Sequence, residues 1–268
     1  MGVYTDGTWR QIFPFIYFIL MFILMGFIDW LYLKIGIDTA VVMKKRRFVM
    51  TPERPAFSIW ALIFLGIGIL TFMNCFNEFS GTFDPVWTPT TFLLMTAWLA
   101  VFSLEIYSLS SLILLISVMT SLQIIIDIPK THEFMHLASG YFVGLLFGWL
   151  ISATLLNIFI FIQQRFFKGQ ENIFVNYSFL FLLYFSHILI TLLMDVATLE
   201  MCWPVSFILL WTVHWVLWKK ERIAEREATW IYLTGLFLAF LICFTTILRV
   251  GIQFDFVNVD LNIDFDTV

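Results

Sequence analysis

Charged residues are scarce in this chain. Asp, Glu, Lys and Arg together make up 13% of its 268 residues, while 61% of the residues are hydrophobic. A soluble globular domain averages about 25% charged residues, because its surface must face water. The composition therefore excludes the soluble classes and indicates an integral membrane protein, with the lipid bilayer as its main surroundings.

The cysteines are too few and too scattered for a disulfide-rich or zinc-binding protein, and the basic residues are too scattered for a nucleic-acid-binding protein. Cys75, Cys202 and Cys243 form no Cys-x-x-Cys pair, so neither a zinc knuckle nor a disulfide framework is indicated. The net charge is -4, and no polar stretch alternates basic with aromatic residues. We therefore expect no nucleic-acid partner.

Long apolar runs are what the sequence has instead. Pro52 and Pro55 suit the first turn of a helix, and the uncharged residues 56–75 that follow are long enough to cross a hydrocarbon layer of roughly 30 Å. Almost no linker separates the third run from the fourth or the sixth from the seventh. The turns predicted between them are residues 108–111 and 201–204. The pattern predicts an all-α, polytopic membrane bundle of about eight transmembrane helices. The eight runs are residues 12–33, 56–75, 90–108, 109–128, 136–163, 177–199, 201–218 and 230–249.

The basic residues favour an even number of spans. Lys and Arg accumulate in the short loops on the side of the membrane that is not translocated. With eight spans, 12 of the 15 basic residues lie on one side, and only Arg10, Lys130 and Arg249 lie opposite. Both termini are then expected on the translocated face. The 12 residues are Lys34, Lys44, Lys45, Arg46, Arg47, Arg54, Arg165, Lys168, Lys219, Lys220, Arg222 and Arg226.

The last residues differ in pattern from the rest of the chain. Apolar and polar side chains alternate after Arg249, as in a strand with one buried face. An isolated strand is not stable in water. We therefore expect the acidic tail, residues 251–268, to dock on a neighbouring membrane subunit.

Histidines supply two further candidate sites. His132 and His136 belong to a His-Glu-x-x-His string, in which two histidines one turn apart bind zinc and the glutamate acts as a base. Asp195 and Glu200 are candidates for the third ligand by elimination only. The alternative is a polar cap at a helix start near the interface. His187 lies within an apolar run, where an ionisable group marks either a functional site or a hydrogen-bonded packing contact.

Three strings of residues resemble one known family. The first, from Thr51 to Trp60, reads Thr-Pro-Glu-Arg-Pro-Ala-Phe-Ser-Ile-Trp. The second is Trp98 with Phe102 and Glu105, and the third spaces Trp149, Ala153 and Asn157 four residues apart. Together they resemble the TspO/peripheral benzodiazepine receptor family, or tryptophan-rich sensory proteins, and especially its long members. The resemblance covers residues 12–163. It departs from the family at Met95, where an Asn often stands.

The resemblance implies a fold and a ligand. It implies a five-helix core at 1–168, a three-helix extension at 169–250 and the tail at 251–268. It also implies a protein without enzymatic activity that binds a hydrophobic small molecule, such as a porphyrin, haem or a sterol. The implied pocket residues are Trp60, Trp98, Phe102, Trp149, Ala153 and Asn157.

Other interpretations of the same residues stay open. The Trp side chains could simply pack, Ala153 could let two helices approach closely, and Asn157 could hydrogen-bond across helices. The fold could also serve as a scaffold, making the chain an accessory subunit of a mitochondrial inner-membrane complex of the respiratory-chain type. A zinc metalloprotease is the third possibility. Because eukaryotic members of the family are mitochondrial, the resemblance favours a mitochondrial membrane.

Overall fold

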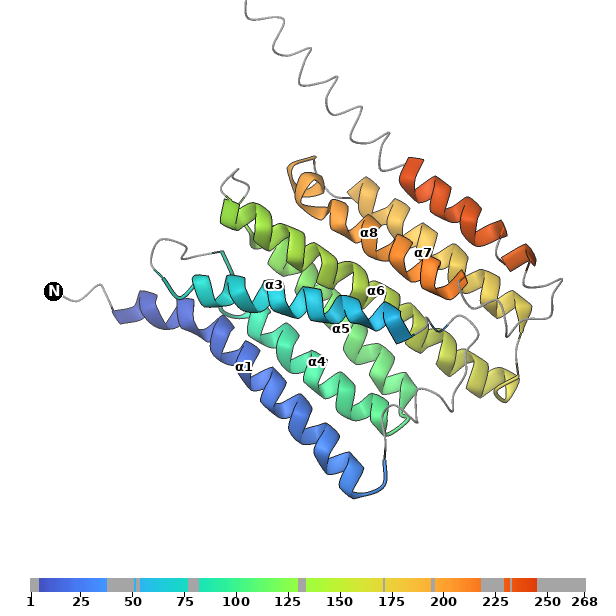
Figure 1. Ribbon diagram of the computed structural model, residues 1–268, viewed down its shortest axis with the longest axis horizontal. Coiled ribbons are helices and arrows are strands. Elements are labelled where there is room, and N and C mark those ends of the chain that lie inside the picture. The colour runs from blue at the N-terminus through green and yellow to red at the C-terminus, as the bar shows by residue number, and fades with distance from the viewer. Residues whose placement is uncertain are drawn as a thin grey trace, which may run out of the picture.

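The computed structural model is a bundle of helices, and it contains no strand among the residues that it describes. Successive helices run in alternate directions, so the start of α1 and the end of the last helix lie at the same end of the bundle (Figure 1). This arrangement agrees with an even number of crossings. The structure describes residues 5–37, 51, 54–76, 82–129, 134–170, 172–193, 196–217, 229–231 and 233–244.

The helices correspond to the predicted apolar runs. Five of them are long and apolar enough to cross a membrane, and shorter apolar helices span Pro204–Val216 and Thr229–Phe244. The predicted class, an all-α membrane bundle, is confirmed. The elements are α1 (Thr5–Lys34), the 3-10 helix η1 (Arg54–Ser58), α3 (Ile59–Met73), α4 (Trp87–Ser103), α5 (Tyr107–Asp127), α6 (Phe134–Phe167), α7 (Ile173–Leu193) and α8 (Val196–Leu217).

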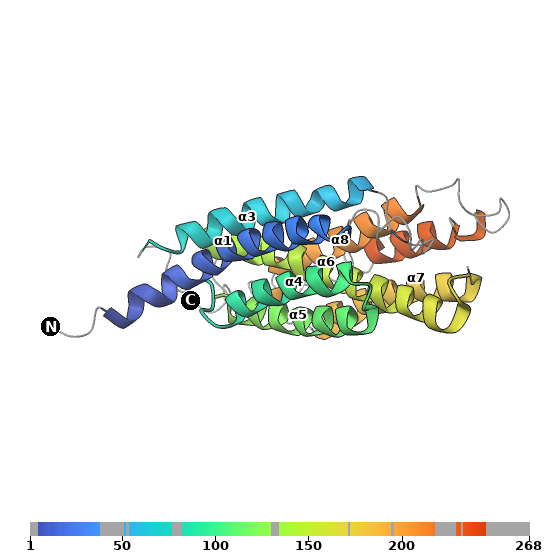
Figure 2. The same ribbon diagram turned by 90° about the horizontal axis from the view of Figure 1, so that it is seen from below.

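Helix α6 is the central element. It packs against α3, α5, α7 and α8, while α1 packs against α3 and α4. Seen from below, α3 and α5 lie on opposite faces of the bundle with α6 between them (Figure 2). Because α6 is surrounded by other helices, 67% of the residues in its most apolar stretch are buried. In the corresponding stretch of α1, 17% of the residues are buried. Helix α1 is therefore a peripheral helix, with most of its apolar surface outside the bundle.

The predicted turn at residues 108–111 is wrong. Helix α4 ends at Ser103, and Glu105 takes a positive φ of 59° in the turn before α5. Residues 108–111 lie within α5. There Ser111 Oγ donates a hydrogen bond to Tyr107 O, one turn earlier, at 2.8 Å. This local bond satisfies the hydroxyl inside an apolar helix, so a serine cluster does not require a turn.

The predicted turn at residues 201–204 is wrong as well. These residues lie within α8, and Pro204 is inside the helix. Proline is tolerated in transmembrane helices because neighbouring groups compensate for the missing backbone hydrogen bond. Helix α7 ends at Leu193, and the antiparallel helix α8 begins at Val196.

Polar side chains connect the helices inside the bundle. Thr91 Oγ1 of α4 donates to Thr120 Oγ1 of α5 at 2.8 Å. Between α8 and η1, the indole nitrogen of Trp211 donates to the carbonyl oxygen of Ala56 at 3.0 Å. Tyr32 of α1 likewise donates to the carbonyl oxygen of Ala100 in α4. Such bonds fix the positions of neighbouring helices where the apolar surroundings give little directional preference.

The division of the chain after residue 168 stays a prediction. Helices α7 and α8 pack directly on α6, and Ile208 of α8 lies in one apolar cluster with Ile63 and Leu145. The strand-like tail, residues 251–268, and the basic run at 44–47 lie outside the described residues. Lys34 and Arg165 lie in the last turns of α1 and α6, at one end of the bundle, and Arg10 lies in the first turns of α1, near the other end.

Candidate functional site

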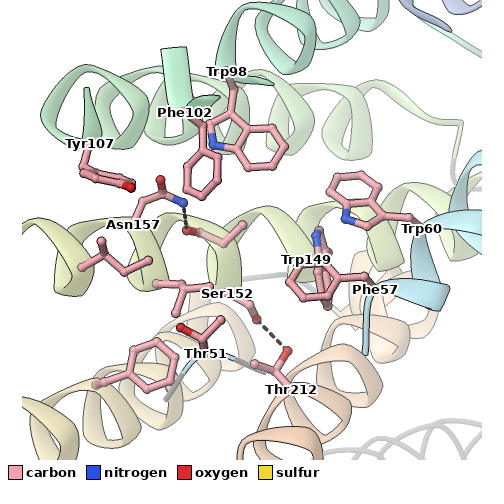
Figure 3. A pocket seen from close by; sticks show the side chains of 14 residues that line it. Thr51, Phe57, Trp60, Trp98, Phe102, Tyr107, Trp149, Ser152, Asn157 and Thr212 are labelled. Carbon is pink, nitrogen blue, oxygen red and sulfur yellow. Dashed lines mark hydrogen bonds between the residues drawn. The ribbon is translucent and has the colours of Figure 1, made fainter. Parts of the chain in front are cut away.

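A narrow cavity lies beside α6 in the interior of the bundle. The volume of the cavity is about 50 Å³. That volume exceeds the roughly 10–15 Å³ that one water molecule needs, but it is well below the roughly 300–1,000 Å³ of pockets for drug-sized ligands. The lining residues are Thr51, Phe57, Trp60, Trp98, Phe102, Tyr107, Trp149, Ser152, Ala153, Leu156, Asn157, Ile160, Phe179 and Thr212 (Figure 3).

All six pocket residues implied by the family resemblance line this cavity. The residues come from three helices, and their part in binding a ligand stays a prediction. The six are Trp60 on α3, Trp98 and Phe102 on α4, and Trp149, Ala153 and Asn157 on α6. Spacing of four residues places side chains one above the other on a helix face, so α4 and α6 each present one row to the cavity.

Two groups of aromatic rings form opposite walls. In the first, Trp149 meets Trp60 and Phe57 edge to face, with ring centroids 5.7 Å and 5.6 Å apart. In the second, Phe102 lies with its ring centroid 5.6 Å from those of both Trp98 and Tyr107. Figure 3 shows the two groups on either side of the cavity. Such walls can pack against the faces and edges of a flat apolar ring.

Asn157 hydrogen-bonds across helices, as one of the sequence interpretations expects. Its Oδ1 accepts a hydrogen bond from Ser110 Oγ of α5 at 2.7 Å, and its Nδ2 donates to the carbonyl oxygen of Ala153 at 2.8 Å. The amide thus joins α5 to α6 at the cavity wall. Lining the cavity and packing the bundle are compatible roles for this residue.

The sequence interpretation missed the contribution of the last helices. Phe179 of α7 and Thr212 of α8 line the cavity, and Thr212 Oγ1 donates to Ser152 Oγ of α6 at 3.2 Å. Tyr107 was missed because it starts α5 instead of lying before a turn. No sequence signal identifies these residues, since each reaches the cavity through helix packing and not through a local motif.

The histidine candidates form no metal site among the residues that the structure describes. His132 and Glu133 lie outside the described residues, as does Asp195, and the side chain of Glu200 is not described either. His136 is partly buried in the first turn of α6. Among the described residues, no group of three His, Cys, Asp or Glu side chains could hold a metal ion. The zinc hypothesis stays untested.

His187 joins three helices of the C-terminal part. Its side chain on α7 is 1% exposed. Its Nδ1 lies 3.4 Å from Ser206 Oγ of α8, and the ring hydrogen-bonds to the backbone of Ile242 in the helix Thr229–Phe244. This geometry supports the packing interpretation of His187, because the ring's polar atoms are directed at neighbouring helices.

The profile of the TSPO-like protein family matches residues 11–248. The chain belongs to the TSPO-like family. The match extends beyond residues 12–163, where the resemblance was recognised from motifs, and includes α7, α8 and the helix Thr229–Phe244. Together with its apolar helices, the match identifies a membrane protein of the TspO type. No curated protein and no solved structure matches this chain.

Proposed function

We propose that this TSPO-like chain is a non-enzymatic membrane protein that binds a hydrophobic small molecule of the porphyrin or sterol class. One observation carries the proposal: the six residues of the family pattern, distant in sequence, surround a single cavity between two aromatic walls. A cavity of apolar and aromatic side chains with a few polar groups is typical of small-molecule sites.

The size of the cavity sets a condition on the ligand. A porphyrin or a sterol is larger than the space of about 50 Å³ that the structure shows. Binding therefore requires the two aromatic walls to move apart, and the ligand then replaces ring-to-ring contacts such as those of Trp149 with Trp60. The first wall is carried by η1, α3 and α6 and the second by α4 and the start of α5, so α3 and α4 are the helices whose separation would widen the cavity.

The chemical types of the lining residues suit a porphyrin that is held by packing contacts and not by a bond to its metal ion. They include no His, Cys or Met, which are the usual axial ligands of haem iron. Tyr107 is the one lining residue of a type that ligates haem iron in some proteins. The aromatic walls would bind the flat face of the ring system, whether or not a metal ion occupies its centre.

Filling the cavity tests the proposal. In detergent-purified protein, Ala153→Leu places three additional carbon atoms at the cavity wall, and we expect protoporphyrin IX to bind at least about tenfold more weakly. Quenching of tryptophan fluorescence measures the affinity. The matched control is Ala97→Leu on the exposed side of α4, which should bind like the unmodified protein. Equal affinity for all three proteins would refute the proposed site.

A second candidate is an accessory subunit of a mitochondrial inner-membrane complex. The observation that favours it is the apolar surface of α1. Only 17% of the apolar stretch of this helix is buried, and the helix exposes Trp9, Phe22 and Trp30. Lipid covers such a surface equally well, so this function ranks second. Extraction in mild detergent followed by native-gel electrophoresis separates the two: migration within a large assembly supports the subunit, and migration alone opposes it. Mitochondrial fractionation tests the proposed membrane.

A further inference from the structure

Trp98 presents a buried polar group at the cavity wall. The indole nitrogen of Trp98 is buried, and no hydrogen-bond acceptor in the described part of the chain lies within reach of it. An indole N–H can only donate. A buried donor without an acceptor costs roughly as much as a lost hydrogen bond, so natural proteins rarely keep one without a reason.

Three polar side chains that line the same cavity are already engaged in hydrogen bonds. Asn157 uses its oxygen for Ser110 and its nitrogen for the carbonyl oxygen of Ala153. Ser152 and Thr212 bond to each other further along the cavity. Figure 3 shows the Trp98 nitrogen on the edge of the ring that is turned toward Phe102 and Asn157. The unpaired donor thus belongs to the aromatic wall formed by Trp98 and Phe102.

We infer that the Trp98 N–H is the polar recognition point of the ligand. The cavity then selects a flat apolar ring compound that carries a hydrogen-bond acceptor, such as a carbonyl or carboxylate oxygen, at one edge. Phe102 and the opposite wall bind the ring, while Trp98 fixes its orientation. The inference rests on the proposed function and goes beyond it, because it specifies a chemical feature of the ligand that apolar packing alone does not require.

A pair of probes with one skeleton isolates this hydrogen bond. Fluorene and 9-fluorenone are both flat tricyclic compounds, and only fluorenone carries a carbonyl oxygen. Equilibrium dialysis measures the binding of each probe to the full-length protein in detergent. The Ala153→Leu variant, with its cavity filled, gives the background from partition into the micelle.

The Trp98→Phe variant keeps an aromatic ring and removes the donor. We expect fluorenone to bind the unmodified protein roughly two- to twelvefold more tightly than fluorene, and this preference should disappear in Trp98→Phe. Phe102→Leu is the matched control, because it removes ring contacts without touching the donor. It should weaken both probes equally and keep the preference for fluorenone.

The outcomes separate this inference from the proposed function. If both probes bind above background and Trp98→Phe changes their affinities equally, the role of Trp98 is refuted while the pocket remains. If neither probe binds above the Ala153→Leu background, the pocket and the inference both fail. Thermal unfolding of each variant confirms that a lost preference does not come from a misfolded protein.

Discussion

Single polar residues connect the helices of this otherwise apolar bundle. Ser110 and Asn157 join α5 to α6, and Ser152 and Thr212 join α6 to α8. All four side chains are buried. Within a membrane, such bonds contribute about 0.6 kcal/mol on average and up to about 1.7 kcal/mol, since the unfolded chain in the bilayer also finds partners.

A double-mutant cycle on Ser110 and Asn157 measures one of these bonds. We expect Ser110→Ala and Asn157→Leu each to destabilise the protein, with a coupling free energy of about 0.6 to 1.7 kcal/mol between them. Unfolding in increasing concentrations of a denaturing detergent provides the values. Ser111→Ala is the control, because its hydroxyl bonds only within α5 among the contacts described. A coupling near zero would contradict the interhelical role.

The two misplaced turns show where residue patterns lose their predictive value in membranes. Ser and Pro are turn signals in water, where the backbone of a loop is hydrated. Inside the bundle, Ser111 bonds to its own helix and Pro204 is accommodated in α8. The spans were predictable because their length is set by the bilayer. Their ends were not, because Leu104–Ile106 carries no Gly, Pro or Asn to mark the turn.

At the scale of the elements, α6 and α8 approach each other closely at Gly148. A Cβ atom at Gly148 would lie 3.1 Å from the Cα of Val205 and 3.2 Å from the Cβ of Ile208. Both distances are shorter than ordinary van der Waals contact, and one of the atoms belongs to the backbone of α8. Glycine therefore allows the two helices to approach, as small residues commonly do in membrane bundles.

Enlarging this residue should separate the two helices. We expect Gly148→Val to destabilise the protein by about 1–3 kcal/mol, because backbone atoms of α8 cannot move aside as a flexible side chain can. Gly26→Val is the matched control on α1, where no atom lies within 4 Å of an added Cβ, and it should change stability by less than about 0.5 kcal/mol. Similar losses in both variants would show that the contact with α8 is not the cause.

For the whole molecule, alternation of helix directions fixes which ends share a side of the membrane. The start of α1 and the end of Thr229–Phe244 lie at one end of the bundle (Figure 1). Epitope tags on the N-terminus and the C-terminus should therefore both be digested, or both be protected, when protease is added to sealed vesicles. Digestion of one tag alone would contradict the even number of crossings. Detergent-opened vesicles, in which both tags are cut, are the control.

The candidate site was predictable to a lesser degree than the fold. The hydropathy of the chain determines the spans, but it cannot tell which helix faces meet. Trp60, Trp98 and Trp149 were predicted from the resemblance to a family, because that resemblance implies that all three line one pocket. Phe179 and Thr212 complete the cavity from helices outside that pattern. Their role depends on how α7 and α8 pack against α6, which composition and spacing do not specify.

The presence of Phe179 and Thr212 on the cavity wall has a consequence for shortened forms of the protein. A chain truncated after residue 168 would keep all six family residues and lose one side of their enclosure. Acyl chains of the bilayer could then enter and compete with the proposed ligand. Fragments of this kind would thus lose the proposed selectivity even where the remaining helices still insert and fold.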